Sequence, residues 1–168
     1  MMAEHFRFRF RTPWIALPLC ALLGACQSDP EVIHHPAIAM SMTADTAVNP
    51  YPDGQPAPVV ARVYQLSAKD RFMVADPMQL IQHDAQTLGD DQLGRDEFIF
   101  APGTTRSITL PGNDKAHFIG IVAAYRAIDK DDWRALVAVP DGGKALSVAV
   151  TLGATGLQVS PAVAPAQK

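Results

Sequence analysis

Cys26 is the residue whose surroundings most clearly indicate a chemical modification. Leu23, Gly24 and Ala25 precede it, and the four residues together have the pattern that a signal peptidase for lipoproteins recognises. That enzyme needs a branched apolar residue and two small residues before a cysteine whose thiol already forms a thioether to diacylglycerol. We therefore expect Cys26 to carry diacylglycerol and an N-acyl chain, and we expect no other cofactor and no metal.

The residues before Cys26 have the organisation of a cleaved signal peptide. Three arginines within residues 7–11 form a positively charged region, and residues 14–23 form a short apolar region. This apolar run is about half as long as a bilayer-spanning helix. An uncleaved anchor with a chance cysteine is the alternative. The organisation favours removal of residues 1–25 and predicts a lipidated tether over residues 26–36.

Gln27 and the charge balance indicate where the mature chain resides and which partners it avoids. An aspartate directly after the lipidated cysteine favours retention in the inner membrane, so Gln27 predicts transfer to the outer membrane. The lipid would then lie in the inner leaflet, and the domain would face the periplasm. Of 14 basic and 17 acidic side chains, the signal removes three arginines and one glutamate, which leaves a net charge of −5. This acidic balance argues against nucleic acid as a partner.

The mature domain has no free cysteine thiol with which to form a disulfide. Cys20 is removed with the signal, and the thiol of Cys26 is consumed by the lipid. The hydrophobic core of the remaining 143 residues must therefore supply the stability, which a domain of this size is able to do.

The sequence has no arrangement typical of a catalytic nucleophile, so we expect no enzymatic activity and no small-molecule substrate. It has no G-x-S-x-G, H-E-x-x-H or P-loop motif. The pair His34-His35 lacks a third metal ligand at a suitable spacing, which favours a solvated linker. The pair His83-Asp84 has no serine or cysteine to activate.

Two pairs of acidic residues are the remaining candidates for a metal site. Asp90-Asp91 and Asp131-Asp132 both lie in predicted turns. Neighbouring carboxylates usually point apart into solvent, which favours ordinary surface turns. A weak calcium site in either turn stays open.

Alternation of apolar and polar residues predicts a mainly β domain over residues 37–160. Seven or eight short strands with regular turn signals are typical of a β-sandwich. The expected strands are residues 37–43, 59–66, 93–100, 105–110, 117–126, 133–139, 145–152 and 157–159. Residues 161–168 are rich in alanine and proline and predict a disordered tail.

A helical insertion interrupts the strands between residues 67 and 89. Asp76 followed by Pro77 has the pattern of a helix start, and Met78, Leu80 and Ile81 supply an apolar helical face. The strand at residues 117–126 is apolar on both faces, so it is expected to lie centrally and to be covered twice. We expect the opposing sheet to cover one face and the helical insertion to cover the other.

The segment 49–58 contains four prolines and predicts a long, stiff loop between the first two strands. Strands that follow each other usually need only two to five residues between them, so a loop of this length is a functional candidate. Tyr51 is amphipathic and has few rotatable bonds, as a binding residue requires. A tolerated surface insertion is an equally good interpretation from the residues alone.

Several short motifs in a fixed order give the chain a family resemblance. After the lipoprotein signal come RVYQL at residues 62–66, LGDD at 88–91, AAYR at 123–126 and WR at 133–134. In this order the chain resembles the TssJ family, also called SciN or VasD, from roughly residue 38 to residue 152. That family supplies the outer-membrane lipoprotein of the type VI secretion system.

The resemblance implies a fold and a partner. The fold would be a transthyretin-like sandwich of two four-stranded sheets, with short helices inserted between strands two and three. Family members are not enzymes; they bind the periplasmic C-terminal part of TssM, which forms a membrane complex with TssL. The loop between the first two strands is the family's contact with TssM. Here the expected contact residues are Asn49, Pro50, Tyr51, Pro52, Asp53, Gly54, Gln55 and Pro56.

A second class of function stays open beside this resemblance. A lipid-anchored, periplasm-facing domain could instead bind carbohydrate or peptidoglycan. Such a module usually presents a row of exposed aromatic side chains, and this chain has only two tryptophans and three tyrosines.

Overall fold

The computed structural model describes residues 34–129 and 132–164. The signal peptide, Cys26, Gln27 and most of the expected tether lie outside the described residues. The elements are, in chain order, β1 (Ile38–Ala44), β2 (Val59–Leu66), α1 (Asp70–Val74), α2 (Pro77–Gln82), α3 (Asp84–Leu88), the 3-10 turn η1 (Gly89–Asp91), β3 (Gln92–Phe100), β4 (Thr105–Leu110), β5 (Phe118–Ala123), β6 (Arg134–Ala138), β7 (Leu146–Leu152) and β8 (Leu157–Val163). Within the described residues, no helix is long and apolar enough to cross a membrane.

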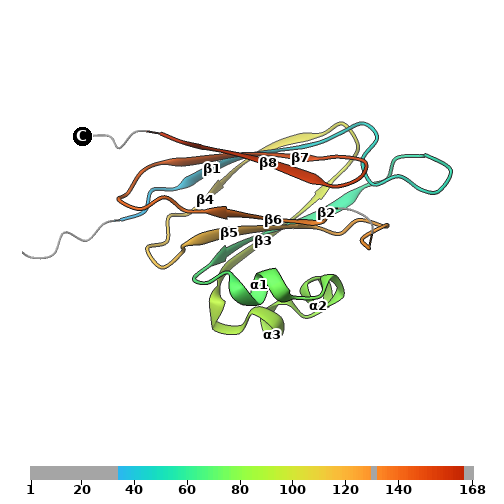
Figure 1. Cartoon of the computed structure of the whole chain (residues 1–168). Helices are drawn as coiled ribbons and strands as arrows, with labels where there is room; N and C mark the ends of the chain where they lie inside the picture. Colours follow the sequence, from blue (N-terminus) through green and yellow to red (C-terminus); the bar gives the residue numbers. More distant parts are fainter. Residues whose placement is uncertain (1–33, 130–131, 165–168) are drawn as a thin grey trace, which may run out of the picture. The chain divides into compact units, whose positions relative to one another are not determined.

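The strands form two four-stranded sheets that pack face to face (Figure 1). One sheet has the strand order β4-β1-β7-β8, and the other has the order β3-β2-β5-β6. The pair β1 and β7 is parallel, and the other strand pairs within the sheets are antiparallel. The predicted β-sandwich of two four-stranded sheets is therefore confirmed.

The main core lies between the two sheets because every second residue of each strand points inward. In β1, Ile38, Met40 and Met42 are buried, while the residues between them are exposed or half-buried. In β7, Val148 and Val150 repeat this pattern from the neighbouring strand. Burying each such side chain stabilises the fold by about 1.5–3 kcal/mol.

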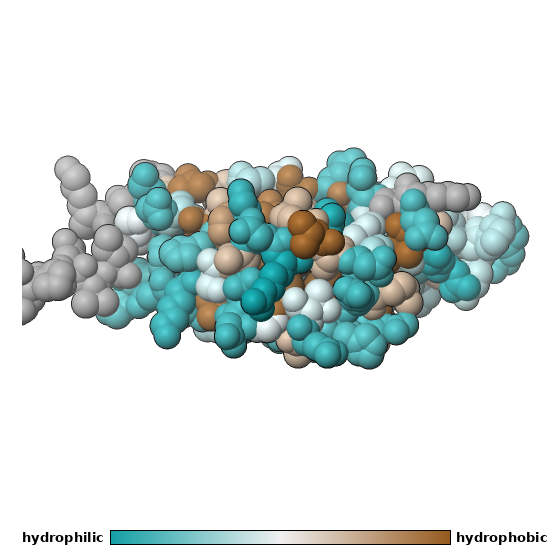
Figure 2. All heavy atoms as spheres, turned by 60° about the horizontal axis from the view of Figure 1, so that its bottom comes forward, coloured by the Kyte–Doolittle hydropathy of each residue, from teal (hydrophilic) through white to brown (hydrophobic). Residues whose placement is uncertain are grey.

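A second apolar cluster joins the three helices to the outer face of the β3-β2-β5-β6 sheet (Figure 1). Tyr64, Leu66 and Val122 contribute from the strands, and Phe72, Leu80 and Leu88 contribute from the helices, together with Ala75 directly after α1. β5 is therefore central in its sheet and covered on both faces, as its apolar sequence predicts. Figure 2 views the molecule from this helical side: most of the visible surface is hydrophilic, with separate apolar patches.

Gly120 in the middle of β5 lies directly against Phe72 of the helical insertion. A Cβ atom at this position would lie 2.8 Å from Cε2 of Phe72 and 3.0 Å from Cδ1 of Leu66. Real Cβ atoms essentially never approach within 3.0 Å of another heavy atom, so a side chain at this position would force the ring of Phe72 to move.

Two strand ends differ from the prediction by more than one residue. β5 ends at Ala123 instead of residue 126, because the chain turns there and the backbone amide of Arg126 bonds to the β1–β2 loop. β8 continues to Val163, so assigning residues 161–163 to a disordered tail was wrong. Pro161 is compatible with β8 because β8 is an edge strand, where one missing N–H donor is tolerated.

Candidate functional site

The β1–β2 loop protrudes beyond the ends of the strands (Figure 1). Its tip is closed by its own backbone: the amide of Tyr51 donates to the carbonyl of Gln55, and the amide of Gly54 donates to the carbonyl of Tyr51, both at 2.8 Å. The amide of Gln55 also donates to the Asp53 carboxylate at 3.0 Å. Gly54 has a φ of 87°, which glycine adopts without strain. These bonds and the four prolines give the loop one defined shape.

Asn49 fixes the base of this loop to the rest of the domain. Its backbone is left-handed, with a φ of 50°, and its side chain is buried. Nδ2 donates to the carbonyl of Pro58 at 2.7 Å, and Oδ1 accepts from the backbone amide of Arg126 at 2.8 Å. The side chain of Asn49 therefore positions the loop, although the sequence placed this residue among the partner-contacting ones.

The other predicted contact residues are accessible. Pro50 is half-buried, and the exposed residues are Tyr51, Pro52, Asp53, Gly54, Gln55 and Pro56. Below them, Val48 and Ala57 are buried, and the amide of Ala57 donates to the carbonyl of Val48 at 3.1 Å. The loop is thus anchored in the core at both ends and open at its tip.

Tyr51 and Arg126 form a composite surface on the side of the loop. The guanidinium carbon of Arg126 lies 3.8 Å from the centroid of the Tyr51 ring, a cation–π contact. Pro50, Pro52 and Ala127 line a shallow hollow together with these two side chains. Tyr51 remains 41% exposed, so part of its ring is free to contact another molecule. Arg126 was not among the predicted site residues, although it closes the AAYR motif.

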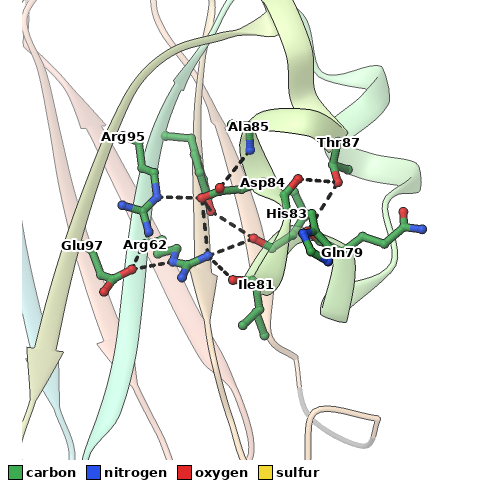
Figure 3. Close-up of polar contacts among 11 residues, drawn as sticks. Arg62, Gln79, Ile81, His83, Asp84, Ala85, Thr87, Arg95 and Glu97 are labelled. Carbon is green, nitrogen blue, oxygen red and sulfur yellow. Dashed lines mark hydrogen bonds and ion pairs between the residues drawn. The ribbon is translucent and has the colours of Figure 1, made fainter.

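A cluster of charged residues lies under the helices on the outer face of β2 and β3 (Figure 3). Arg62 donates from Nε to Glu97 at 2.7 Å, and Arg95 donates from Nε to Asp84 at 2.6 Å. The hydroxyl of Tyr64 donates to the same Asp84 oxygen at 3.0 Å. Arg95 also bonds to Glu97. The two arginines and two carboxylates balance in charge.

The environment of this cluster moves the pKa values of its groups away from neutrality. Burial raises the pKa of Tyr64 to about 12. Burial would also raise the pKa of Asp84, but hydrogen bonds from Arg95, Tyr64 and a backbone amide outweigh it and hold that pKa below its usual value. The hydrogen bond from Arg62 lowers the pKa of Glu97. General acid–base catalysis works best with a pKa near the operating pH, and these shifts move the pKa values of the groups away from it.

Arginines cap the ends of the short helices, which explains what the charged cluster does. The last carbonyls of a helix have no partner within the helix. Arg62 donates to the carbonyls of Leu80 at 3.0 Å and Ile81 at 2.6 Å, close to the end of α2. Arg134 likewise donates to the carbonyls of Phe72 and Ala75, at the end of α1.

α3 ends in the same way as the other two helices. Arg71 donates to the carbonyl of its last residue, Leu88, at 3.0 Å. Helices of five or six residues are not stable alone, so these arginines hold the insertion in place.

Among the described residues, the acidic pairs and the histidine pair do not come together in one site. Asp91 pairs with Arg71 at 3.6 Å, and Asp131 lies outside the described residues. Nδ1 of His34 bonds to Asp114 at 2.9 Å, and the backbone amide of His35 donates to the same carboxylate at 2.8 Å. Within residues 34–129 and 132–164, no three His, Cys, Asp or Glu side chains gather in a way that could hold a metal ion.

Comparisons with known proteins agree on one family. The family model for type VI secretion lipoproteins, described by the names T6SS-SciN, VasD, EvfM and TssJ, matches residues 36–155. The crystal structure of the T6SS lipoprotein TssJ1 from Pseudomonas aeruginosa is similar, with 33% identity and a TM-score of 0.73, over 78% of this chain and 99% of that one. A comparison with curated protein sequences found no match.

Two further solved structures are similar. Lip of Serratia marcescens, a membrane-bound component of the type VI secretion system, has 27% identity and a TM-score of 0.70, over 74% of this chain and 97% of its own. A chain of a type VI membrane complex has 26% identity and a TM-score of 0.66, over 76% of this chain and 99% of that chain.

Proposed function

Because the chain belongs to the TssJ family of type VI secretion lipoproteins, we propose that it links the outer membrane to the periplasmic C-terminal part of TssM. TssM in turn forms the membrane complex together with TssL. The proposed role is non-catalytic: one end of the protein holds a lipid, and the other end holds a protein partner.

The membrane end of this link is the lipid on Cys26. Residues 1–25 would be removed, and residues 26–36 would form the tether between the acylated cysteine and the sandwich. One acyl chain holds a protein only weakly, whereas the diacylglycerol and N-acyl chain together hold it stably. Gln27 directs the mature protein to the outer membrane, with the lipid in its inner leaflet and the domain in the periplasm.

The partner end is the tip of the β1–β2 loop. The observation that carries this proposal is the stacked pair of Tyr51 and Arg126, presented on a loop whose base is fixed by Asn49. Ordering a flexible loop during binding costs conformational entropy, and a loop that is already fixed avoids most of that cost. Tyrosine and arginine are also among the residues that most often contribute strongly at protein interfaces.

Deleting residues 51–55 tests the loop. All five residues are exposed, so the sandwich should fold and be lipidated as before. The deletion variant should lose binding to the purified periplasmic part of TssM in calorimetry. Tyr51→Ala alone should cost about 1–2 kcal/mol of binding free energy.

Tyr51→Phe is the matched control, because it keeps the ring that stacks on Arg126. It should bind TssM nearly as well as the unchanged protein. Full-strength binding by a folded deletion variant would move the interface away from the loop, and the helical insertion around residues 72–81 would then be the next surface to test.

A further inference from the structure

The helical insertion covers the outer face of the β3-β2-β5-β6 sheet only in part. The cover ends at Arg62, whose guanidinium bonds to the carbonyls of Leu80 and Ile81 in α2 (Figure 3). Further along β2, toward the β1–β2 loop, the next outward-facing residue is Val60. It pairs with Ile99 in β3, and its carbonyl accepts from the amide of Ala124 at 2.8 Å. Ile99, Val60 and Ala124 therefore form a row across the sheet, which we call the apolar row.

The apolar row is accessible. Ile99 is 61% exposed, and it lies on β3, an edge strand of the sheet. Val60 and Ala124 are half-buried. Proteins usually place charged residues on the exposed face of an edge strand, since an apolar edge invites contact with another chain. An exposed isoleucine beside two further apolar residues departs from this rule. Such an apolar surface is typical of a contact with another molecule.

A pocket opens directly beside the apolar row. Its volume is about 130 Å³. Its lining consists of Val60, Arg62, Ile81, Glu97, Val122 and Ala124. Small-molecule sites usually have volumes of about 300–1,000 Å³, so this pocket is too small for a metabolite and suits a single side chain.

The charges at the pocket decide which side chain fits. Arg62 and Glu97 both belong to its lining, and their 2.7 Å hydrogen bond pairs one positive with one negative charge. A charged side chain entering the pocket would lose water without finding an unpaired partner. The other lining residues are aliphatic. The pocket therefore favours a neutral aliphatic side chain.

The pocket and the loop surface have lining residues that are close in the chain. Ala124 lines the pocket, and Arg126, two residues further along the chain, stacks on Tyr51. Two residues of chain span at most about 7 Å, so the backbones of Ala124 and Arg126 lie within that distance. A partner that contacts the Tyr51–Arg126 pair is thus placed near the pocket.

We propose that the apolar row and its pocket are a second contact for the partner that binds the β1–β2 loop, and that the pocket receives one neutral aliphatic side chain of that partner. This inference rests on the proposed function, because it takes the loop as the first contact.

The test replaces the apolar row by threonine, which keeps the β-branched shape and strand preference but adds a hydroxyl. The double variant Val60→Thr/Ile99→Thr is made in the detergent-purified lipoprotein and titrated with the purified periplasmic part of TssM. Its affinity should fall about tenfold. Val163→Thr is the matched control: Val163 is 53% exposed on β8 of the other sheet, and its replacement should leave the affinity unchanged. Thermal unfolding of each variant verifies that it is folded.

Tyr51→Ala in the same titration separates this inference from the proposed function. Weaker binding by both Tyr51→Ala and the double variant supports two contacts. If Tyr51→Ala binds more weakly while the folded double variant binds like the unchanged protein, the loop contact stands and the second contact is refuted. If neither variant binds more weakly, the proposed interface and the inference built on it are both refuted.

Discussion

Comparing Arg62→Met with Arg95→Met separates helix capping from ion pairing. Arg62 caps α2, whereas Arg95 contributes ion pairs in the same cluster. Methionine keeps a long apolar side chain over the sheet but removes the guanidinium. Four hydrogen bonds are lost: one to Glu97, two to the carbonyls of Leu80 and Ile81, and one to Asp84 that is so long, at 3.4 Å, that we assign it no energy. From β2, the end of α2 then keeps the long hydrogen bond of the Tyr64 hydroxyl to the Leu80 carbonyl, at 3.4 Å.

The expected cost follows from the exposure of each partner. The Glu97 side chain is 38% exposed, so water screens its ion pair, and we assign that pair about 0.5 kcal/mol. The Arg62 side chain is only 16% exposed, so each carbonyl loses a charged donor in a largely buried site, at about 1–1.5 kcal/mol per bond. The sum is about 3 kcal/mol. For a domain of this size it should lower the melting temperature by about 10 °C.

Arg95→Met is the matched comparison. Arg95 bonds to Asp84 and Glu97 in the same cluster, but the bonds found for it involve no helix carbonyl, and its side chain is 33% exposed. It should cost only about 1 kcal/mol. Circular dichroism melts of both variants provide the measurement. Equal losses, or a larger loss for Arg95→Met, would show that ion pairing and not helix capping holds the insertion.

Four further predictions concern the lipid, the glycine contact and the effect of acid. Cys26→Ser should block lipidation and cleavage, and a variant that still matures and fractionates with the outer membrane would refute it. Gln27→Asp should keep the protein in the inner membrane, as density-gradient fractionation would report. Gly120→Ala should lower stability by about 1–3 kcal/mol in denaturant unfolding, and Phe72→Leu in the same chain should restore part of it. Acid should weaken the domain through Asp84 and Glu97, which have lowered pKa values in the fold.

The sign of the acid effect follows from linkage. A carboxyl whose pKa is lower in the folded state than in the unfolded state binds fewer protons when folded, so it stabilises the fold at higher pH. The ordinary pKa values are 3.8 for Asp84 and 4.5 for Glu97. Their contribution should be complete above about pH 5.5 and should be lost as the pH falls through the lower folded values. Urea midpoints between pH 3 and pH 6 measure it, and Arg62→Met should flatten the dependence that Glu97 causes.

The sequence predicted the elements whose signal is local. The alternation in β1 and β7 and the two apolar faces of β5 each follow from a few neighbouring residues, because burial repeats with the period of a strand. The helix start at Asp76 is equally local: its carboxylate accepts from the amide of Met78 at 2.8 Å. The loop at residues 49–58 could be located from its prolines alone.

Contacts between distant residues could not be predicted in the same way. The bond from the Arg126 amide to Asn49 spans 77 positions, and nothing near Asn49 distinguishes a buried positioning residue from an exposed contact. The bonds between Arg134 and α1 span about 60 positions. The extra residues of β8 are paired with β7 across a turn, and their composition alone indicated a tail. Such contacts are determined by the tertiary arrangement, for which a single sequence carries no local signal.

The position of β1 in the chain and in the sheet determines how the protein would carry a mechanical load. It follows the end of the expected tether and directly precedes the β1–β2 loop, and it has six residue pairs with β4 and six with β7. In the proposed arrangement, tension between the membrane and TssM would enter at one end of this strand and leave at the other. The backbone of β1 would carry most of this tension directly, and the part that passes to the core would load both ladders in shear, because the hydrogen bonds run across the strand. How long the link lasts under load would then be set by the rate of forced unfolding, not by equilibrium stability.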